Sequence, residues 1–323
     1  MKISEKNIKT WSRIGSRATF GMTALELGKT IEDLMVLTAD TSTSAGLDRF
    51  KKQFPGKFLD VGIAEQNMIG IAAGLASEGQ TVITATFAPF QTMRCCEQIK
   101  VNIGYMGQKV CMVGLASGLV LGMLGYTHCC IEDVNIMRSI PGVAVISPAD
   151  CGETAKAIAA AVQHENSVYI RLTGGANNPI VYEHDFDFTI GKANVLKEGT
   201  DIVIVASGTM VYNSLKAAEI LIDRDISATV IDMHTIKPLD TTIIEEYGRR
   251  SKLVVTVEEH SVIGGLGSAV SQHLSAKGNM PRQLTIALPD QYGQGGEYGY
   301  LLEKHGLKPD QIAGKIFSQF KDL

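Results

Sequence analysis

One acidic residue stands where a surface carboxylate would not be expected. In residues 58–90, FLDVGIAEQNMIGIAAGLASEGQTVITATFAPF, Glu65 begins a run whose small apolar residues recur at helical spacing. Removing a carboxylate from water is costly unless a partner satisfies it, so we expect Glu65 to have one. A first-turn glutamate stabilised only by the helix dipole is the alternative, and spacing alone does not separate the two.

Two other groups of side chains have types that suit a binding site. Phe87, Phe90 and Met93 follow at intervals of three residues, which suits either an ordinary core stripe or the wall of a ring-binding pocket. His128 stands in the glycine-rich loop SGLVLGMLGYTHCC. A lone histidine is usually structural, but this loop directly follows a predicted strand, which favours a site.

The elements that position these residues follow a strand, turn, helix, strand order. Strands are expected over 58–61 and 81–86, with a turn at Gly62 and the helix that begins at Glu65 between them. This order predicts one right-handed crossover unit of a parallel sheet. The same alternation predicts further strands over 34–38, 110–115, 143–146 and 168–172, and helices over 13–30, 48–54, 91–105, 132–139 and 150–163.

The loop ADTSTSAG follows the strand over 34–38 and contains Asp40 and Ser44. Open α/β sheets bind ligands at the carboxyl ends of their strands, so this loop is a candidate site on topology alone.

The second half of the chain repeats the alternation after an irregular stretch over 173–200. It predicts strands over 202–206, 227–232, 253–258 and 283–287, and helices over 211–223, 241–247 and 266–276. We therefore expect an α/β protein of two doubly wound domains, 1–185 and 186–323, with the boundary near Asp185.

Composition excludes several classes of function. The chain has 323 residues, 45% of them apolar, and a net charge of −4, with no basic run that would indicate nucleic-acid binding. Its first residues lack the apolar core of a signal peptide, and no apolar run approaches the roughly 18 residues of a membrane span. We expect a cytoplasmic protein without membrane contact. The six cysteines have no CxxC spacing, so neither a zinc site nor a disulfide framework is indicated.

The motifs DVGIAEQNM, AAGLA and TFAPF resemble the pyrimidine-binding domain of thiamin diphosphate enzymes of the transketolase group, which includes 1-deoxyxylulose-5-phosphate synthase. The resemblance extends over about residues 13–316 and is closest to the separately encoded C-terminal half of split transketolases. It implies that Glu65 is the catalytic glutamate that bonds the cofactor's aminopyrimidine. Phe87, Phe90 and Met93 would wall that ring. His128 would contact reacting substrate oxygens, although the family's following glutamine is Cys129 here.

The resemblance also implies a phosphate-binding set. Arg17 stands 23 positions before Asp40, the spacing expected between the family's phosphate arginine and the acidic residue of its cofactor-side Ala-Asp loop. Ser44 follows in the family's position, and Arg171 matches an arginine at the end of the last strand. The planar guanidinium of arginine suits phosphate because it donates two parallel hydrogen bonds.

Departures from the family pattern affect the substrate. The usual Glu-Asp pair before the Thr-His is replaced by Met123 and Leu124, and a usual histidine by Ala116. A site that loses a hydroxyl-binding carboxylate also loses its preference for that hydroxyl, so the sugar is expected to differ from xylulose 5-phosphate.

The motif EEHSVIGGLG in the second half does not complete a dinucleotide fingerprint, because Val270 occupies the third glycine position. His260 in this motif is expected to serve packing or a dimer interface, and His234 is similarly ambiguous.

The chain lacks the Gly-Asp-Gly run with which the family binds diphosphate and magnesium, and no oxygen-ligand cluster for Mg²⁺ is evident in the sequence. The resemblance therefore implies a separate N-terminal subunit that holds Mg²⁺ and the diphosphate of thiamin diphosphate in a two-plus-two assembly. The expected activity is transfer of a two-carbon ketol unit between sugars or sugar phosphates. Acyl transfer from a 2-oxo acid, as in deoxyxylulose phosphate synthase or a dehydrogenase beta subunit, and a non-catalytic partner subunit remain alternatives.

Overall fold

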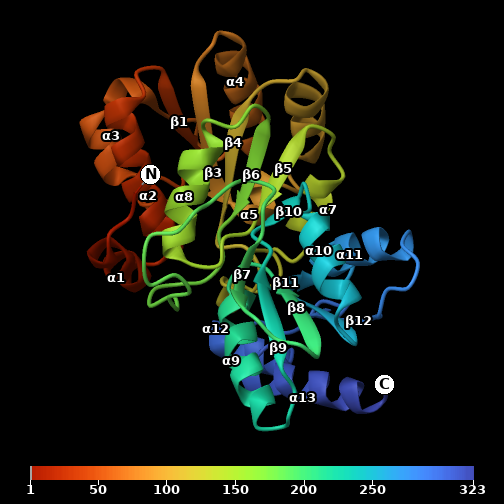
Figure 1. Cartoon of the computed structure of the whole chain (residues 1–323). Helices are drawn as coiled ribbons and strands as arrows, with labels where there is room; N and C mark the ends of the chain where they lie inside the picture. The colour runs from red at the N-terminus through yellow and green to blue at the C-terminus, as the bar shows by residue number, and fades with distance from the viewer. Residues whose placement is uncertain (1) are drawn as a thin grey trace.

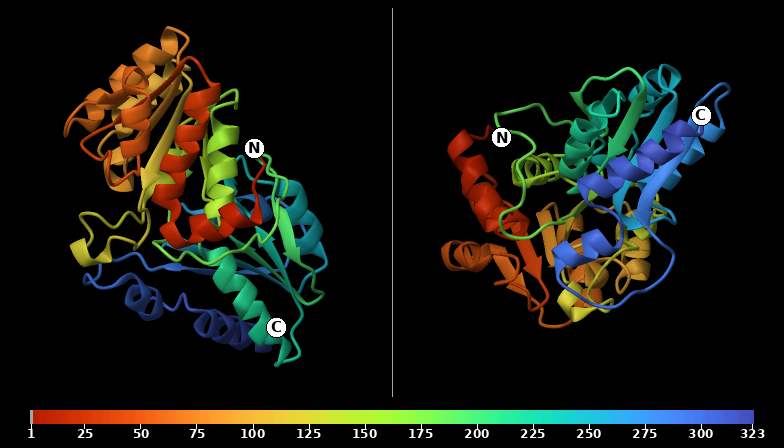
Figure 2. Two further views of the ribbon diagram at one scale, coloured as in Figure 1. Left: turned by 90° about the vertical axis from the view of Figure 1, so that its left-hand side faces the viewer. Right: turned by 90° about the horizontal axis from the view of Figure 1, so that it is seen from below.

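The computed structural model describes residues 2–323, which form two α/β sheets with helices on both faces of each (Figure 1). Figure 2 shows the two sheets and their helices from two further directions. Buried apolar clusters lie on each side of both sheets, so each sheet has its own core. The expected α/β class with two doubly wound halves is confirmed.

The first sheet has the strand order β10-β5-β6-β4-β3-β1-β2. Its strands are β1 (Leu34–Thr38), β2 (Phe58–Asp60), β3 (Thr81–Phe87), β4 (Val110–Leu115), β5 (Val143–Ile146), β6 (Ser167–Arg171) and β10 (Thr235–Lys237). All neighbours pair in parallel except β10, which is antiparallel to β5. Strands covered on both faces read as continuous apolar runs, and β4, VCMVGL, is buried along its whole length.

Helices surround this sheet and connect its strands. They are α1 (Glu5–Ile14), α2 (Ser16–Thr30), α3 (Asp48–Gln53), η1 (Pro55–Lys57), α4 (Glu65–Ser77), α5 (Ala88–Gln91), α6 (Cys96–Gln98), η2 (Ile99–Tyr105), η3 (Gly122–Leu124), α7 (Asp133–Arg138) and α8 (Cys151–Ala161). Asp150 caps α8, as its position suggests, by accepting a hydrogen bond from Glu153 N at 2.8 Å.

Two predicted helices differ in the structure. The helix expected over 13–30 is two helices, because Gly15 has φ +85° and lies so close to Gly175 that a Cβ would come 2.6 Å from its carbonyl oxygen. The helix expected over 91–105 is interrupted: α5 ends at Gln91, and helical structure resumes only with α6 at Cys96 and the π-helical η2 that follows it.

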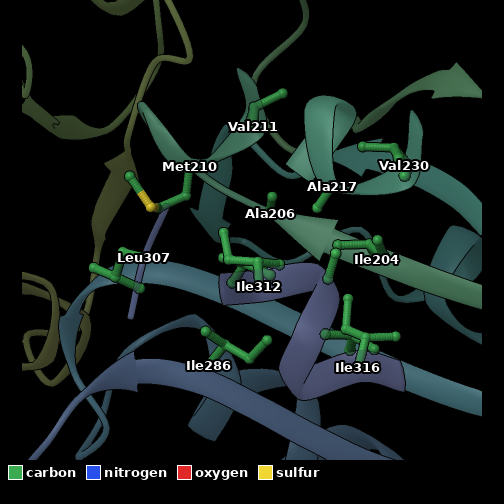
Figure 3. Close-up of a cluster of buried hydrophobic side chains, with 14 of the residues drawn as sticks. Ile204, Ala206, Met210, Val211, Ala217, Val230, Ile286, Leu307, Ile312 and Ile316 are labelled. Atoms are coloured by element: carbon green, nitrogen blue, oxygen red, sulfur yellow. The ribbon is translucent and has the colours of Figure 1, made fainter. Parts of the chain in front are cut away.

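The second sheet has the order β12-β11-β8-β9-β7. Its strands are β7 (Asn194–Lys197), β8 (Ile202–Ala206), β9 (Ala228–Asp232), β11 (Leu253–Ser261) and β12 (Arg282–Leu288), and its helices are α9 (Met210–Ile222), α10 (Thr241–Arg249), α11 (Leu266–Ser275), α12 (Tyr298–Lys304) and α13 (Pro309–Lys321). Figure 3 shows one core of this half, a buried cluster to which Met210 and Val211 of α9, Ile204 of β8 and Ile312 and Ile316 of α13 all belong.

The sequence analysis did not predict two strands of the second half. Both β7 and β10 are short edge strands, and β7 is only partly buried along its length. Strand β10 follows β9 of the second sheet along the chain but pairs with β5 and so extends the first sheet, as Figure 1 shows. The two halves are therefore joined by a shared strand pairing as well as by the connecting segment.

No helix within residues 2–323 combines the length and the apolar composition that crossing a bilayer requires.

Candidate functional site

The carboxyl ends of four adjacent strands, β2, β1, β3 and β4, present most of the predicted site residues. Glu65 follows β2, Asp40 and Ser44 follow β1, Phe87 ends β3, and His128 lies in the loop after β4. Because parallel strands end at the same edge of a sheet, these side chains are brought to one edge of the molecule's first half.

Glu65 is the first residue of α4 and is only 4% exposed. Its Oε1 accepts a hydrogen bond from Arg94 Nη1 at 2.8 Å, and the Arg94 side chain is 42% exposed. The amino end of α4 also favours negative charge. The partner that the buried carboxylate requires is therefore supplied by Arg94, a residue that the sequence analysis did not identify although it directly follows Met93.

Aromatic rings gather beside this ion pair. The centroids of Phe87 and Phe90 lie 6.3 Å apart, and that of His128 lies 6.3 Å from Phe87 and 5.4 Å from Phe90, all edge to face. The Arg94 guanidinium carbon lies 3.9 Å from the Phe90 ring centroid, so Glu65, Phe90 and His128 are linked through direct neighbours. Met93 is 50% exposed and joins none of these contacts.

The side chain of His128 is half-buried and oriented by its own loop. Its Nδ1 lies 3.0 Å from Thr127 Oγ1, and its backbone N donates to Gly125 O at 3.0 Å. Met123 and Leu124, in the same loop, are 74% and 57% exposed, which is unusual for apolar side chains of that size.

The loop after β1 is tied to the entrance of α4 by Asp60. One carboxylate oxygen, Asp60 Oδ1, accepts hydrogen bonds from Asp40 N at 2.9 Å and Gly62 N at 3.0 Å. Asp40 itself is exposed and has φ 53°, a left-handed conformation that aspartate tolerates better than most residues. Asp60 thus holds two loops of the site together, a role visible only once β1 and β2 are known to pair.

Arg17 and Ser44 come from elements that touch. Helix α2, near whose start Arg17 lies, packs so closely on the loop after β1 that Gly21 and Gly46 leave no room for a Cβ between them. Within residues 2–323, the Arg17 guanidinium makes no ion pair or hydrogen bond. It therefore has its full donor capacity at this edge.

Arg171 departs from the expected substrate set. Its side chain is 3% exposed, and its Nε donates to Asp133 Oδ1 and Oδ2 at 3.0 and 2.9 Å. Its Nη2 donates to Glu259 O at 2.7 Å. The buried ion pair raises the pKa of Arg171 despite desolvation, so the guanidinium stays charged inside the protein. This geometry argues for a structural role behind the site and against the phosphate role suggested by the sequence.

The chemistry of this edge suits a heteroaromatic ring with a basic nitrogen, since a buried carboxyl group lies beside two aromatic side chains. No group of three or more His, Cys, Asp and Glu side chains within the described residues could hold a metal ion.

Comparison with protein families assigns both halves. The transketolase pyrimidine-binding domain matches residues 12–178, and the transketolase C-terminal domain matches residues 191–312. The chain belongs to the transketolase family. Between the two matched ranges lies the segment in which we place the domain boundary, near Asp185, and the division into 1–185 and 186–323 stays a proposal.

Relatives within the transketolase family include separately encoded C-terminal sections. A putative transketolase C-terminal section of Methanocaldococcus jannaschii is 40% identical over 95% of this chain and 96% of its own length. The 6-deoxy-6-sulfo-D-fructose transketolase subunit SqwH of Clostridium sp. (strain MSTE9) is 40% identical over 92% and 91%. By contrast, the 36% identical 1-deoxy-D-xylulose-5-phosphate synthase of Desulforudis audaxviator is covered over only 48% of its length.

A solved structure agrees with this assignment. It is described as a split-gene transketolase in an inactive β4 tetramer, is 37% identical, and superposes with a TM-score of 0.85 over 95% of this chain and 98% of its own. This transketolase-family chain is thus a C-terminal section, and the family implies thiamin diphosphate as cofactor. Glu65, Phe87 and Phe90 fit the pyrimidine of that cofactor, while the described residues offer no cluster for the metal that accompanies its diphosphate.

His234 and His260, the two histidines of the second half that the sequence analysis considered, are both buried. Buried His260 has Nδ1 2.8 Å from Ser261 O, and buried His234 stacks on Phe188 with centroids 4.3 Å apart. Burial lowers the pKa of His234 to about 4, so this imidazole is neutral near pH 7. Both environments are those of packed core residues.

Proposed function

We propose that this chain is the C-terminal subunit of a thiamin diphosphate-dependent transketolase that moves a two-carbon ketol unit from a ketose or ketose phosphate to an aldose. One observation supports this most strongly: a buried carboxyl group, two aromatic rings and an imidazole meet at the carboxyl edge of a parallel sheet. Their order along the chain agrees with the family motif.

Glu65 would hold the pyrimidine. Its carboxyl group would hydrogen-bond a ring nitrogen and move a proton there, and low exposure strengthens such a bond. When bound, thiamin diphosphate supplies the nucleophilic carbon that attacks the donor ketone. Phe87 and Phe90 would bind the pyrimidine face by stacking, and Met93 would add contact at the exposed rim. Arg94 would have to share Glu65 with the ring, because both bind the same carboxyl group.

His128 would act on the sugar. With Thr127 beside Nδ1, the histidine's other ring nitrogen is available to hydrogen-bond a reacting oxygen. Arg17 and Ser44 would bind the terminal phosphate or another anionic group, since Arg17 has its donors available at this edge. Asp40 would contact the cofactor from the loop after β1. The exposed Met123 and Leu124 would face the carbon chain of the sugar and disfavour a hydroxyl group there.

The cofactor's diphosphate and Mg²⁺ would be held by a separate N-terminal subunit. Neither the sequence nor the described residues of this chain provide a magnesium cluster. Two copies of each subunit would assemble so that each cofactor lies between unlike chains, with its pyrimidine next to Glu65.

The test is turnover after reconstitution with the diphosphate-binding subunit, thiamin diphosphate and Mg²⁺. Glu65→Ala is expected to lower ketol transfer by about 10² to 10⁴-fold while the complex still assembles. Glu78→Ala, at the opposite and exposed end of α4, is the matched control and should leave turnover unchanged. Equal turnover of Glu65→Ala and wild type would refute the proposal.

A second candidate is acyl transfer from a 2-oxo acid. The exposed apolar Met123 and Leu124 favour it, because such a donor lacks the hydroxyls of a sugar. Release of carbon dioxide from pyruvate by the reconstituted enzyme, without ketol transfer from ketose phosphates, would establish this alternative.

A third candidate is a non-catalytic partner subunit that retains the pyrimidine fold as an interface. Calorimetric titration of the reconstituted complex with thiamin diphosphate separates it from both enzymes. Absence of cofactor binding would support the non-catalytic candidate, and binding that Glu65→Ala abolishes would exclude it.

A further inference from the structure

The loop that carries His128 is closed at its base by a pair of backbone hydrogen bonds. Gly118 N donates to Cys130 O at 2.8 Å, and Cys130 N donates to Gly118 O at 2.9 Å. Residues 119–129 between them form a closed excursion from the end of β4, which we term the His128 loop. These two hydrogen bonds fix the position of the two ends of the loop, but they do not fix its orientation relative to the rest of the site.

Glu259 of β11, in the second half, contacts the base of the His128 loop. Its Oε1 accepts a hydrogen bond from Leu119 N at 2.7 Å. Its Oε2 accepts from Tyr298 Oη at 2.7 Å and from Thr209 Oγ1 at 3.0 Å. Glu259 is 2% exposed, and Gly118 leaves no room for a Cβ against its carboxylate. Burial raises the pKa of Glu259, while Arg171 and these hydrogen bonds oppose the rise.

The backbone of Glu259 joins the same network. Its carbonyl oxygen accepts from Arg171 Nη2 at 2.7 Å, and the same nitrogen lies 3.4 Å from Cys130 O at the other end of the loop base. Both ends of the His128 loop are thus tied to one residue of the second sheet, directly through Leu119 and through Arg171 at Cys130.

The tip of the loop is held by the same half of the chain. Gly296 N donates to Gly122 O at 3.0 Å, and Tyr126 and Tyr292 meet edge to face with centroids 5.4 Å apart. The left view of Figure 2 shows the yellow His128 loop beside the blue segment that leads to α12. The loop therefore lies between the proposed site and the second half.

We propose that Glu259 is a positioning residue for the reaction: it holds the His128 loop in the orientation that presents His128 to the substrate. The inference rests on the proposed function, because it gives His128 a substrate to meet. It assigns the C-terminal half a part in turnover, since a charge-assisted hydrogen bond that a loop amide donates to a buried carboxylate is strong and directional. A shift of about 1 Å in such a loop can cost about 10²-fold in rate.

The adjacent residue provides a matched control. Glu258 is 1% exposed, and its two oxygens accept from Leu266 N at 2.7 Å and Gly267 N at 2.8 Å at the start of α11. Successive side chains of a strand point to opposite faces, so the two buried glutamates accept hydrogen bonds from backbone amides on opposite sides of β11. Only Glu259 contacts the His128 loop.

The first measurement is amide hydrogen exchange in the full chain. Glu259→Ala should speed exchange in residues 118–130 by about 10- to 100-fold, as expected for loss of a hydrogen bond to a charged group. Glu258→Ala should instead speed exchange around residues 264–268 and leave the His128 loop unchanged. Glu259→Gln retains an oxygen for Leu119 N and should restore most of the protection. Unchanged exchange in residues 118–130 of Glu259→Ala would overturn the inference.

The second measurement is kinetic, on the complex reconstituted with the diphosphate-binding subunit, thiamin diphosphate, Mg²⁺ and a ketose phosphate donor. Glu259→Ala should lower kcat by about 10- to 100-fold with little change in KM, and Glu258→Ala should not. In a His128→Ala background, Glu259→Ala should have little further effect, because both substitutions remove the same contribution.

The outcomes separate the two proposals. Full additivity of His128→Ala and Glu259→Ala in an active complex would overturn the positioning role and leave the proposed function intact. An inactive wild-type complex would instead refute the proposed function, while the exchange experiment would still decide whether Glu259 holds the loop.

Discussion

Two regions of this molecule bury carboxyl groups, and they satisfy them differently. At the site edge, Glu65 is 4% exposed but its partner Arg94 is 42% exposed. Deeper inside, Asp133 pairs with Arg171, and both are at most 3% exposed. Burial alone therefore does not distinguish Glu65, which we propose to bind the cofactor, from the structural Asp133. The accessibility of the partner does, because a cofactor can approach only a carboxyl group whose other neighbour can move.

A third arrangement lies between the two halves and uses no cation. The carboxyl groups of Glu153 of α8 and Asp232 of β9 are close neighbours, and both residues are fully buried. Asp232 also accepts from Tyr182 Oη at 2.7 Å, and Glu153 accepts from the backbone N of Ala149. The oxygens Glu153 Oε1 and Asp232 Oδ1 accept no hydrogen bond from a donor group within residues 2–323. Two carboxyl groups can meet in this way when a proton lies between them.

The largest effect on stability is expected at the fully buried pair. Arg171→Leu should lower the free energy of unfolding by about 3–5 kcal/mol, because Asp133 would be left charged and buried without its cation. Urea denaturation of the isolated chain measures this, with Arg94→Leu as the control at the exposed partner. Adding Asp133→Asn to Arg171→Leu should recover part of the loss. A loss of less than about 1 kcal/mol for Arg171→Leu would contradict the prediction that Asp133 depends on Arg171 to neutralise its buried charge.

The Glu153–Asp232 carboxyl pair predicts that stability depends on pH. The cause is the retention of protons by buried carboxyl groups, not the pairing of a buried charge with a cation. Desolvation raises the pKa of Asp232 from 3.8 to about 7, and desolvation together with the neighbouring Asp232 raises the pKa of Glu153 well above its usual value. The folded state therefore keeps protons that the unfolded chain has released. Stability is retained below about pH 4 and falls as pH rises towards 7, by about 1.4 kcal/mol per pH unit for each retained proton.

The pH prediction is tested by urea denaturation at several pH values from about 4 to about 8. Glu153→Gln should flatten the profile, because its amide can donate to Asp232 without a shared proton. Asp150, which also raises the pKa of both groups, and Tyr182 are unchanged in this variant. The same slope in Glu153→Gln and wild type would assign the pH dependence to other groups.

The three arrangements also show how far sequence reasoning extends. The strands over 34–38, 143–146 and 202–206 were predicted with the bounds that the structure has, because continuous β-branched and apolar runs indicate strands buried on both faces. Strands β7 and β10 were missed because short edge strands have no such run. Glu65, Phe87 and Phe90 were proposed from one long motif and His128 from a separate glycine-rich loop, and the structure brings the four side chains together.

Partners far apart in the sequence could not be predicted in the same way. Arg171 was expected to face a substrate, but Asp133, 38 positions earlier, neutralises it inside the fold. Glu259 and Leu119 lie 140 positions apart, and only the packing of the two halves reveals their contact. A motif identifies which residue types a family uses. Which partner a charged side chain pairs with depends on which segments of the chain lie next to each other in the fold.

The smallest effect is expected at the pair that matters most for the proposed chemistry. A double-mutant cycle of Glu65→Gln and Arg94→Leu in the isolated chain should give a coupling free energy of about 0–1 kcal/mol, since a half-exposed arginine is largely stabilised by water when it is released. Urea denaturation of the four proteins measures it. Such a weak coupling would allow a cofactor ring to replace the guanidinium or to share the Glu65 carboxyl group with it. A coupling as large as that expected between Asp133 and Arg171 would mean that Glu65 is bound too tightly to its own chain, and the contrast between the site edge and the interior would disappear.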